Sequence, residues 1–170
     1  MAIPKKVINF LEKGKVKYET IKHRTVYTAF DKAKTLKISE KMVGKTLILK
    51  MNPVGSRRLS FGASGKLAMV LIPANKKLDK GKIKKFVKTK KIEFASERLI
   101  KNKLKGVKVG AIPPFGNLWG LKTFIDNSLM KENEIILNSG DYNFSIKISS
   151  NQLKKILLDA IFGNFSEKKK

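Results

Sequence analysis

The sequence predicts a mixed α/β domain with a largely antiparallel or mixed sheet. Segments with the period of a helix and segments typical of strands are intermixed along the chain, and polar turns join several of the strands. With 170 residues, 42% of them hydrophobic, the chain is long enough for one domain with a buried core. Because there is no internal repeat and no long linker, we expect a single domain over residues 1–165 and a short basic tail, residues 166–170.

Five segments carry the signals of a helix. Thr28, Asp79 and Ser96 each precede a helical pattern, and these residue types favour the N-cap position. A last helix begins near residue 150, carries an apolar stripe and is expected to end at Gly163. The other predicted helices span residues 4–11, 29–37, 80–89 and 97–104.

Seven segments favour strands. Alternation over residues 45–51 puts Lys45 and Leu47 on one face and Thr46 on the other. Residues 68–72 are apolar throughout, which is typical of a strand buried on both faces. The predicted strands span residues 16–21, 45–51, 57–61, 68–72, 121–125, 134–137 and 144–148.

The charge of the chain is strongly unbalanced, with 38 basic and 13 acidic residues and a net charge of +25. The tail supplies little of this excess, so the folded body is basic, and this indicates a polyanionic partner. Nearly all of the basic residues are lysines, whose point charge suits phosphate better than base edges. We therefore expect salt-sensitive RNA binding with weak sequence readout. The candidate contacts lie on the outer side of the predicted helix 80–89: Lys80, Lys84, Lys85 and Lys88.

The composition excludes several kinds of site. The chain has no cysteine, which rules out disulfides, thiol nucleophiles and thiolate zinc sites and fits a cytoplasmic protein. The single histidine, His23, rules out a histidine-rich metal site, and neither a P-loop nor a dinucleotide motif occurs. No apolar run reaches the roughly 20 residues that span a bilayer, and the N-terminus lacks the apolar core of a signal peptide. We expect no metal, no cofactor and no membrane partner.

Residues 110–116, Gly-Ala-Ile-Pro-Pro-Phe-Gly, are predicted to form a rigid, non-helical loop. Pro113 and Pro114 fix the backbone and lack an N–H, while the flanking glycines let another group approach the main chain. A plain surface turn is the alternative, but such turns rarely carry side chains as large as Ile112 and Phe115. We therefore interpret the loop as part of a binding site whose remaining N–H groups are free for a ligand.

Among the lysines, Lys45 is the strongest single candidate for a functional residue. It follows Gly44 at the head of a predicted strand, on the apolar face, where its side chain can enter a pocket. An unpaired buried ammonium is costly, so we expect an anionic or carbonyl partner. Most lysines in so basic a chain are solvated, and that alternative stays open for Lys45.

Three further motifs have both a functional and an ordinary explanation. His23 is either a substrate contact or a surface histidine beside Arg24. Tyr27 is interpreted as an aromatic residue of a pocket or of the core. The Asn-Ser-Gly sequence at residues 138–140 ends a predicted strand, and its alternative is a simple turn with Gly140 at positive φ.

Four motifs, taken in order, resemble those of the YbaK/ProX family of aminoacyl-tRNA deacylases, which is related to the editing domain of bacterial prolyl-tRNA synthetases. They are Val-Tyr-Thr-Ala at 26–29, Gly-Lys-Thr at 44–46, the proline loop at 110–116 and Asn-Ser-Gly at 138–140. The resemblance covers nearly the whole chain, and the proline loop is its most specific motif. It implies a mixed, barrel-like β-sheet surrounded by helices.

The resemblance implies hydrolysis of the ester that links a wrong amino acid to the 3′ end of a tRNA, most often the tRNA for proline, with prolyl-tRNA synthetase as a candidate partner. The family lysine corresponds to Lys45 and the loop glycine to Gly110, which are the implied catalytic residues. They would hold the ester carbonyl while water attacks, helped by a ribose hydroxyl because no protein base is evident. The candidate substrate-binding residues, from motifs and resemblance together, are His23, Tyr27, Thr46, Ile112, Pro113, Pro114, Phe115, Asn138, Ser139 and Gly140.

The chain departs from the family after the Asn-Ser-Gly turn, where many members carry an acidic residue or histidine and this chain has Asp141, Tyr142, Asn143 and Ser145. The amino acid removed is therefore left open among small residues, with alanine favoured over cysteine. The alternative function is a non-catalytic tRNA-binding or synthetase-accessory module of the same fold. The lysines of residues 80–88 would then form its functional surface.

Overall fold

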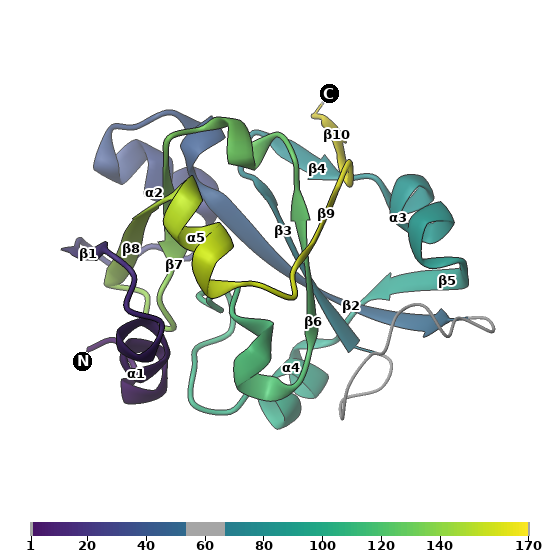
Figure 1. The fold of residues 1–170 in the computed structure, drawn as a ribbon, viewed down its shortest axis with the longest axis horizontal. Coiled ribbons are helices and arrows are strands. Elements are labelled where there is room, and N and C mark those ends of the chain that lie inside the picture. Colours follow the sequence, from purple (N-terminus) through teal and green to yellow (C-terminus); the bar gives the residue numbers. More distant parts are fainter. Residues whose placement is uncertain (1, 54–66, 170) are drawn as a thin grey trace.

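The computed structural model describes residues 2–53 and 67–169, which fold into five α-helices and ten β-strands (Figure 1). The mixed α/β class predicted from the sequence is confirmed. The helices are α1 (Lys5–Lys13), α2 (Ala29–Leu36), α3 (Lys80–Val87), α4 (Glu97–Lys103) and α5 (Ser150–Ile156). The strands are β1 (Tyr18–Lys22), β2 (Gly44–Pro53), β3 (Leu67–Pro73), β4 (Lys76–Leu78), β5 (Thr89–Phe94), β6 (Lys122–Asp126), β7 (Glu134–Asn138), β8 (Phe144–Ser149), β9 (Ile161–Gly163) and β10 (Ser166–Lys168).

The largest sheet has five strands in the order β5-β2-β3-β6-β9. Strand β2 pairs antiparallel with β3 and β5, whereas β3, β6 and β9 are parallel neighbours. Strand β3 is buried along its whole length, as its continuous apolar run predicts. Over the described residues none of the sheets closes on itself, so the barrel-like sheet implied by the resemblance is an open mixed sheet here.

A second sheet, β1-β8-β7, is antiparallel throughout, and Asn138 at the end of β7 lies opposite Ser145 of β8. A single parallel bridge between Val43 and Ile136 joins this sheet to the head of β2. The first residues of β2 therefore lie beside β7, close to Asn138.

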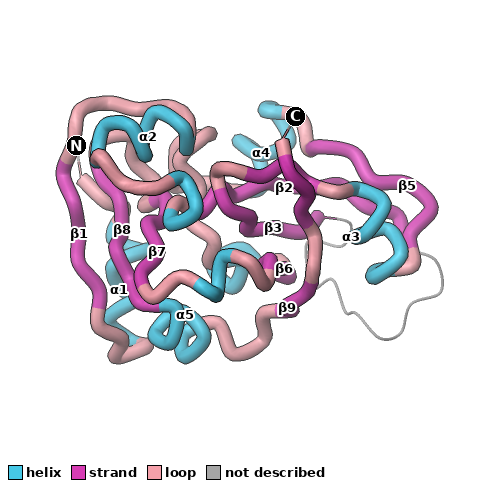
Figure 2. Tube along the Cα trace, turned by 90° about the horizontal axis from the view of Figure 1, so that it is seen from above, coloured by secondary structure: helices cyan, strands magenta, loops and turns pink. Residues whose placement is uncertain are grey.

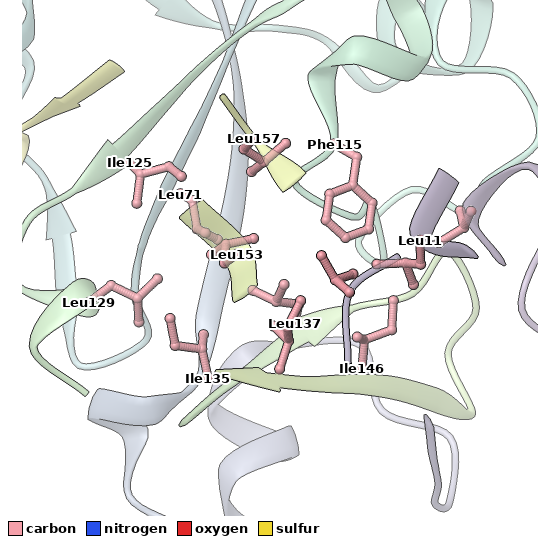
Figure 3. Close-up of a cluster of buried hydrophobic side chains, with 13 residues drawn as sticks. Leu11, Leu71, Phe115, Ile125, Leu129, Ile135, Leu137, Ile146, Leu153 and Leu157 are labelled. Atoms are coloured by element: carbon pink, nitrogen blue, oxygen red, sulfur yellow. The ribbon is translucent and has the colours of Figure 1, made fainter. Parts of the chain in front are cut away.

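Helices cover both faces of the second sheet (Figure 2). On one face, α1 and α5 pack with Ile135 and Leu137 in the main apolar cluster, which Figure 3 shows around Leu137. On the other face, Ile136 packs in a cluster with Ala33 of α2. Because side chains alternate along a strand, Asn138 shares the face of Ile136 and lies on the α2 side.

Four of the helices begin at a capping residue with a side-chain hydrogen bond, and three of these caps, Thr28, Asp79 and Ser96, are predicted from the sequence. Thr28 Oγ1 accepts the N–H of Asp31 at 3.0 Å. Asp79, Ser96 and Ser149 cap α3, α4 and α5 in the same way, each through a side-chain oxygen that accepts an N–H three residues further on. These bonds satisfy N–H groups that the first turn of a helix leaves without a partner.

The end of the chain differs from the prediction. Helix α5 stops at Ile156 and does not continue to Gly163. The segment before Gly163 instead forms β9, because the edge of β6 offers a parallel pairing partner, and Asp126 Oδ1 fixes the next turn by accepting the Phe165 N–H at 2.7 Å. Residues 166–168 of the predicted tail also enter the fold, as β10 paired with β4.

Strands β4 and β5 were not predicted because both are short and rich in lysine, a composition typical of edge strands and not of the buried interior. The strand expected at residues 57–61 lies outside the described residues. Among the described helices, none has the length and hydrophobicity that crossing a bilayer requires.

Candidate active site

Three segments that are distant in the sequence meet at one end of β7 and β8. The His23 N–H donates to the Asn143 carbonyl at 2.9 Å, and the Val26 N–H donates to the Tyr142 carbonyl at 3.1 Å. The chain that follows β1 therefore runs beside the β7–β8 turn and carries His23 and Tyr27 to it.

The loop before the two prolines is bound to the same turn. The Gly140 N–H donates to the Ala111 carbonyl at 2.7 Å, and the Lys108 N–H donates to the Gly140 carbonyl at 3.0 Å. Gly110 and Gly140 have φ of +89° and +102°, which glycine adopts without strain. Gly110 is exposed, so a ligand can approach its main chain; the Tyr27 carbonyl lies 3.5 Å from where a Cβ would stand.

Polar side chains fix the shape of the β7–β8 turn. Ser139 Oγ is fully buried and donates to the Phe144 carbonyl at 2.7 Å. Asp141 accepts the Asn143 N–H at 2.9 Å and forms a 3.1 Å ion pair with Lys108. Burial by itself raises the pKa of Asp141, but these two partners outweigh it and hold the pKa below its usual value. Asp141 is therefore an anion that stabilises the turn.

His23 has both ring nitrogens engaged. Nδ1 lies 2.8 Å from the Arg24 carbonyl, and Nε2 lies 2.8 Å from Ser145 Oγ. Burial lowers the pKa of His23, against the opposing bond to Arg24, and the charge of Lys32 lowers it further, so we assign a neutral ring. A carbonyl can only accept, so Nδ1 carries the proton and Nε2 accepts the Ser145 hydroxyl. The ring is thus held in place rather than free to activate water.

Lys32 is the residue of this cluster that sequence reasoning missed. Its Nζ donates to Asn138 Oδ1 at 2.6 Å, and the residue is only 5% exposed. Burial lowers its pKa to about 8. A signal was present in the sequence, because Lys32 completes the inner stripe of α2 with Ala29, Ala33 and Leu36. A lysine within such a stripe predicts a buried cation.

Lys45 lies near this cluster through its backbone, while its ammonium is bound elsewhere. By alternation from the Val43 bridge, Lys45 lies on the α2 side of β2. Its Nζ donates to the Lys76 carbonyl at 3.0 Å, and burial lowers its pKa. In the described part of the chain no hydrogen bond joins Lys45 to the other candidate residues. Thr46 has a buried hydroxyl that finds no partner among the same residues.

The proline loop packs inward. Phe115 is fully buried, with its ring 5.1 Å from that of Phe10, and Ile112 is 4% exposed in a separate apolar cluster. Pro113 and Pro114 are also buried. These four loop residues therefore belong to the core of this structure and would support a ligand site from behind.

Two of the loop N–H groups that we expected to be free have internal partners. The Ala111 N–H donates to the Lys108 carbonyl at 3.0 Å, and the Gly116 N–H donates to Thr123 Oγ1 at 3.1 Å. Ala111 and Gly116 are also buried, so Gly110 is the part of the loop that a ligand can reach.

Three of the predicted RNA-binding lysines, Lys80, Lys84 and Lys85, lie on α3, and Lys88 caps its C-terminal end. Figure 1 shows this helix at the opposite end of the molecule from β1, β8 and β7. The Lys80 ammonium lies 4.8 Å from the centre of the exposed Phe94 ring. An open hollow of about 600 Å³ lies beside the helix and is lined in part by Lys85 and Phe86. Phe86 is 47% exposed, and its ring is held edge-on against Phe165 at 5.3 Å. This surface combines cations with aromatic rings.

The cluster at the β7–β8 turn offers hydrogen-bond donors and an aromatic ring, and its histidine is already engaged. Tyr27 is 64% exposed, and its ring lies edge-on to that of Tyr142 at 4.8 Å. Within residues 2–53 and 67–169, no group of three or more acidic or histidine side chains could hold a metal ion. The geometry suits a ligand that combines a planar ring with oxygen acceptors.

Comparisons with known proteins identify a family and a fold that this chain shares. One protein family, described as the aminoacyl-tRNA editing domain, matches the chain over residues 23–156. Two solved structures resemble it over nearly their full lengths. Hypothetical protein APE2540 has a TM-score of 0.78 and 20% identity, covering 95% of this chain and 99% of that one. A candidate trans-editing enzyme for prolyl-tRNA synthetase has a TM-score of 0.73 and 18% identity, covering 96% of each chain. At these identities the structural likeness establishes a shared fold.

Proposed function

Because the match extends over most of the sequence, this chain belongs to the aminoacyl-tRNA editing domain family, and we propose that it hydrolyses the ester of a mischarged tRNA. The observation that carries the proposal is that the matched segment, residues 23–156, begins at His23 and contains all three segments that meet at the β7–β8 turn. The product would be a free amino acid and an uncharged tRNA.

We propose that the substrate is tRNA for proline charged with alanine or cysteine, and that the enzyme acts in trans, beside prolyl-tRNA synthetase. The support is the shared fold with the candidate trans-editing enzyme for prolyl-tRNA synthetase. Alanine remains the favoured amino acid of the two, on the basis of the compact proline loop and the absence of cysteine in the chain.

In the proposed mechanism, Lys45 anchors the substrate and the Gly110 N–H stabilises charge on the ester carbonyl. Gly110 is supported in this role by its exposure and its positive φ. The exposed Tyr27 ring offers a surface on which the terminal adenine can stack. Since His23 Nε2 already accepts a hydrogen bond from the Ser145 hydroxyl, a ribose hydroxyl of the substrate is the better group to assist the attacking water.

The tRNA body would be held by the basic surface of α3. Lys80, Lys84, Lys85 and Lys88 supply point charges for phosphates, and the exposed Phe86 ring supplies a face for an unpaired base. A non-catalytic tRNA-binding module is the second candidate function, because this surface would serve such a module equally well.

The two candidates are separated by a deacylation assay on tRNA for proline charged with alanine, cysteine or serine. We expect release of alanine or cysteine at a rate well above that of spontaneous hydrolysis. Proline-charged tRNA is the control and should remain intact. Tight tRNA binding without release of any amino acid would favour the binding module.

A further inference from the structure

The Lys32 ammonium is incompletely satisfied by the protein. An ammonium has three N–H donors, and among the described residues Lys32 makes one hydrogen bond, to Asn138 Oδ1. Within the same residues no carboxylate lies within ion-pair distance of it. The amide of Asn138 is neutral, so it satisfies one donor without cancelling the charge.

Burial of this cation is unfavourable unless a ligand completes its surroundings. At 5% exposure the residue is largely shielded from bulk water, and the lysine stands where the other members of the α2 stripe are apolar. An apolar residue there would pack without a desolvation cost. The two remaining donors are therefore best explained by an acceptor that arrives with the substrate.

The position of Lys32 indicates which part of the substrate supplies that acceptor. Its partner Asn138 is half-buried at the end of β7, directly before the turn that binds the Gly110 loop. On an aminoacyl ester the α-ammonium would be repelled by a second cation, and the ribose hydroxyls are neutral. The ester carbonyl oxygen is the one atom that gains negative charge as water adds.

We propose that Lys32 is a substrate-binding residue whose ammonium donates to the carbonyl oxygen of the aminoacyl ester, with Asn138 holding the ammonium in place. When water adds to the carbonyl carbon, the C=O electron pair moves onto this oxygen beside Lys32. As the pair returns, the bond to the ribose oxygen breaks, and that oxygen leaves with the proton that the attacking water has given up. This inference rests on the proposed ester hydrolysis. It makes Lys32 a second cation of the site, in addition to Lys45.

The proposed role of Lys32 implies that the rate of hydrolysis changes with pH in a defined direction. The charged form of Lys32 is the active one, so the enzymatic rate, corrected for spontaneous ester hydrolysis, should decline as pH rises through about 8. The titratable neighbour is His23, whose own pKa is influenced by both Lys32 and Asp141. Because the pKa of His23 is lowered from 6.5, its titration belongs to the acidic limb, whereas the alkaline limb reports Lys32 together with Lys45, whose pKa burial also lowers.

The test compares Lys32→Met with Lys34→Met, an exposed lysine of the same helix that is the matched control. Binding is measured with two probes: adenosine, and alanine joined by an amide to 3′-amino-3′-deoxyadenosine. A lost charge-assisted hydrogen bond corresponds to about a 10- to 100-fold weaker affinity. We expect this loss for Lys32→Met with the alanyl probe alone, together with a change in the alkaline decline in rate that Lys34→Met does not show.

A measurement on the wild-type protein covers the case in which Lys32→Met fails to fold. The pKa of the Lys32 ammonium, followed by NMR, should rise when the alanyl probe binds and stay constant with adenosine. An unchanged pKa, or equal affinity of Lys32→Met and wild type for the alanyl probe, would overturn the inference. If the alanyl probe binds in a manner that depends on Lys32 but the protein has no deacylase activity, the proposed hydrolysis is refuted and Lys32 remains a ligand-binding residue.

Discussion

Lys32 and Lys45 share two features: burial lowers the pKa of each, and the ammonium group of each is bound to a neutral oxygen atom. Lys32 bonds to the Asn138 amide and Lys45 to the Lys76 carbonyl. Neither acceptor cancels the charge, so burial lowers the pKa of both lysines. Both therefore retain donors that an incoming oxygen atom could use.

For Lys45→Ala we expect nearly complete loss of deacylation. Loss of one donor to a developing oxyanion typically lowers the rate by about 10²–10³-fold, while tRNA affinity should stay close to that of the wild type because the phosphates bind elsewhere. Single-turnover hydrolysis and a filter-binding titration measure the two effects. Lys50→Ala, an exposed lysine of the same strand, is the control; full activity of Lys45→Ala would remove Lys45 from the site.

For Gly110→Ala we expect a loss of about 1–2 kcal/mol in the free energy of unfolding, because φ of +89° is strained for any residue with a Cβ. A steric clash is not the cause, since the new Cβ would lie 3.5 Å from its nearest neighbour. Urea denaturation measures the change. Gly81→Ala, in α3, is the control and should be neutral or stabilising; an equally stable Gly110→Ala would show that the loop adopts another backbone conformation.

At the scale of the elements, local signals predicted the helices better than the short strands. Thr28, Asp79 and Ser96 cap helices because the bond is made within one turn of chain. Strands β4, β9 and β10 depend on partners far along the sequence, and β9 replaced the predicted continuation of α5 because β6 offered an edge. A sequence pattern within seven residues contains no information about such a distant pairing partner.

Helix α3 carries a prediction about RNA binding. Replacing Lys84 and Lys85 by glutamate should weaken the affinity for tRNA and flatten its dependence on salt, because fewer counterions are released on binding. Fluorescence titrations of tRNA binding at salt concentrations between about 50 and 200 mM would measure both the affinity and its dependence on salt. The matched control places glutamate at two exposed lysines, Lys13, which is the last residue of α1, and Lys15, which follows the helix. If the two double variants lose affinity equally, the net charge rather than α3 governs binding.

At the scale of the whole molecule, the sequence indicated individual residues of the candidate site but not how the fold brings them together. His23, Tyr27, Gly110 and Gly140 were each noticed in the sequence, and the structure brings them together through main-chain hydrogen bonds at one turn. The direction of the Lys45 ammonium could not be predicted, because it depends on β4. The burial of Ile112 and Phe115 could not be predicted, because a sequence shows that a side chain is large and apolar but not which side of a loop it faces.

The two proposed functions lie at opposite ends of the fold. The β7–β8 turn and α3 are separated by the five-stranded sheet (Figure 1). A tRNA held at both ends would have to lie across the length of the domain, with its acceptor end at the turn. With a net charge of +25, much of the surface between them would attract its phosphates.

The small ribbon of β4 and β10 affects how often the Lys45 side chain can move. It consists of three residue pairs, and its Lys76 carbonyl holds the Lys45 ammonium. Short two-stranded ribbons open far more often than central strands do, so amide hydrogens in β4 should exchange with deuterium long before those of β3. Each opening would release the Lys45 side chain, so the frequency with which this ribbon opens would set how often that lysine is free to turn towards a substrate.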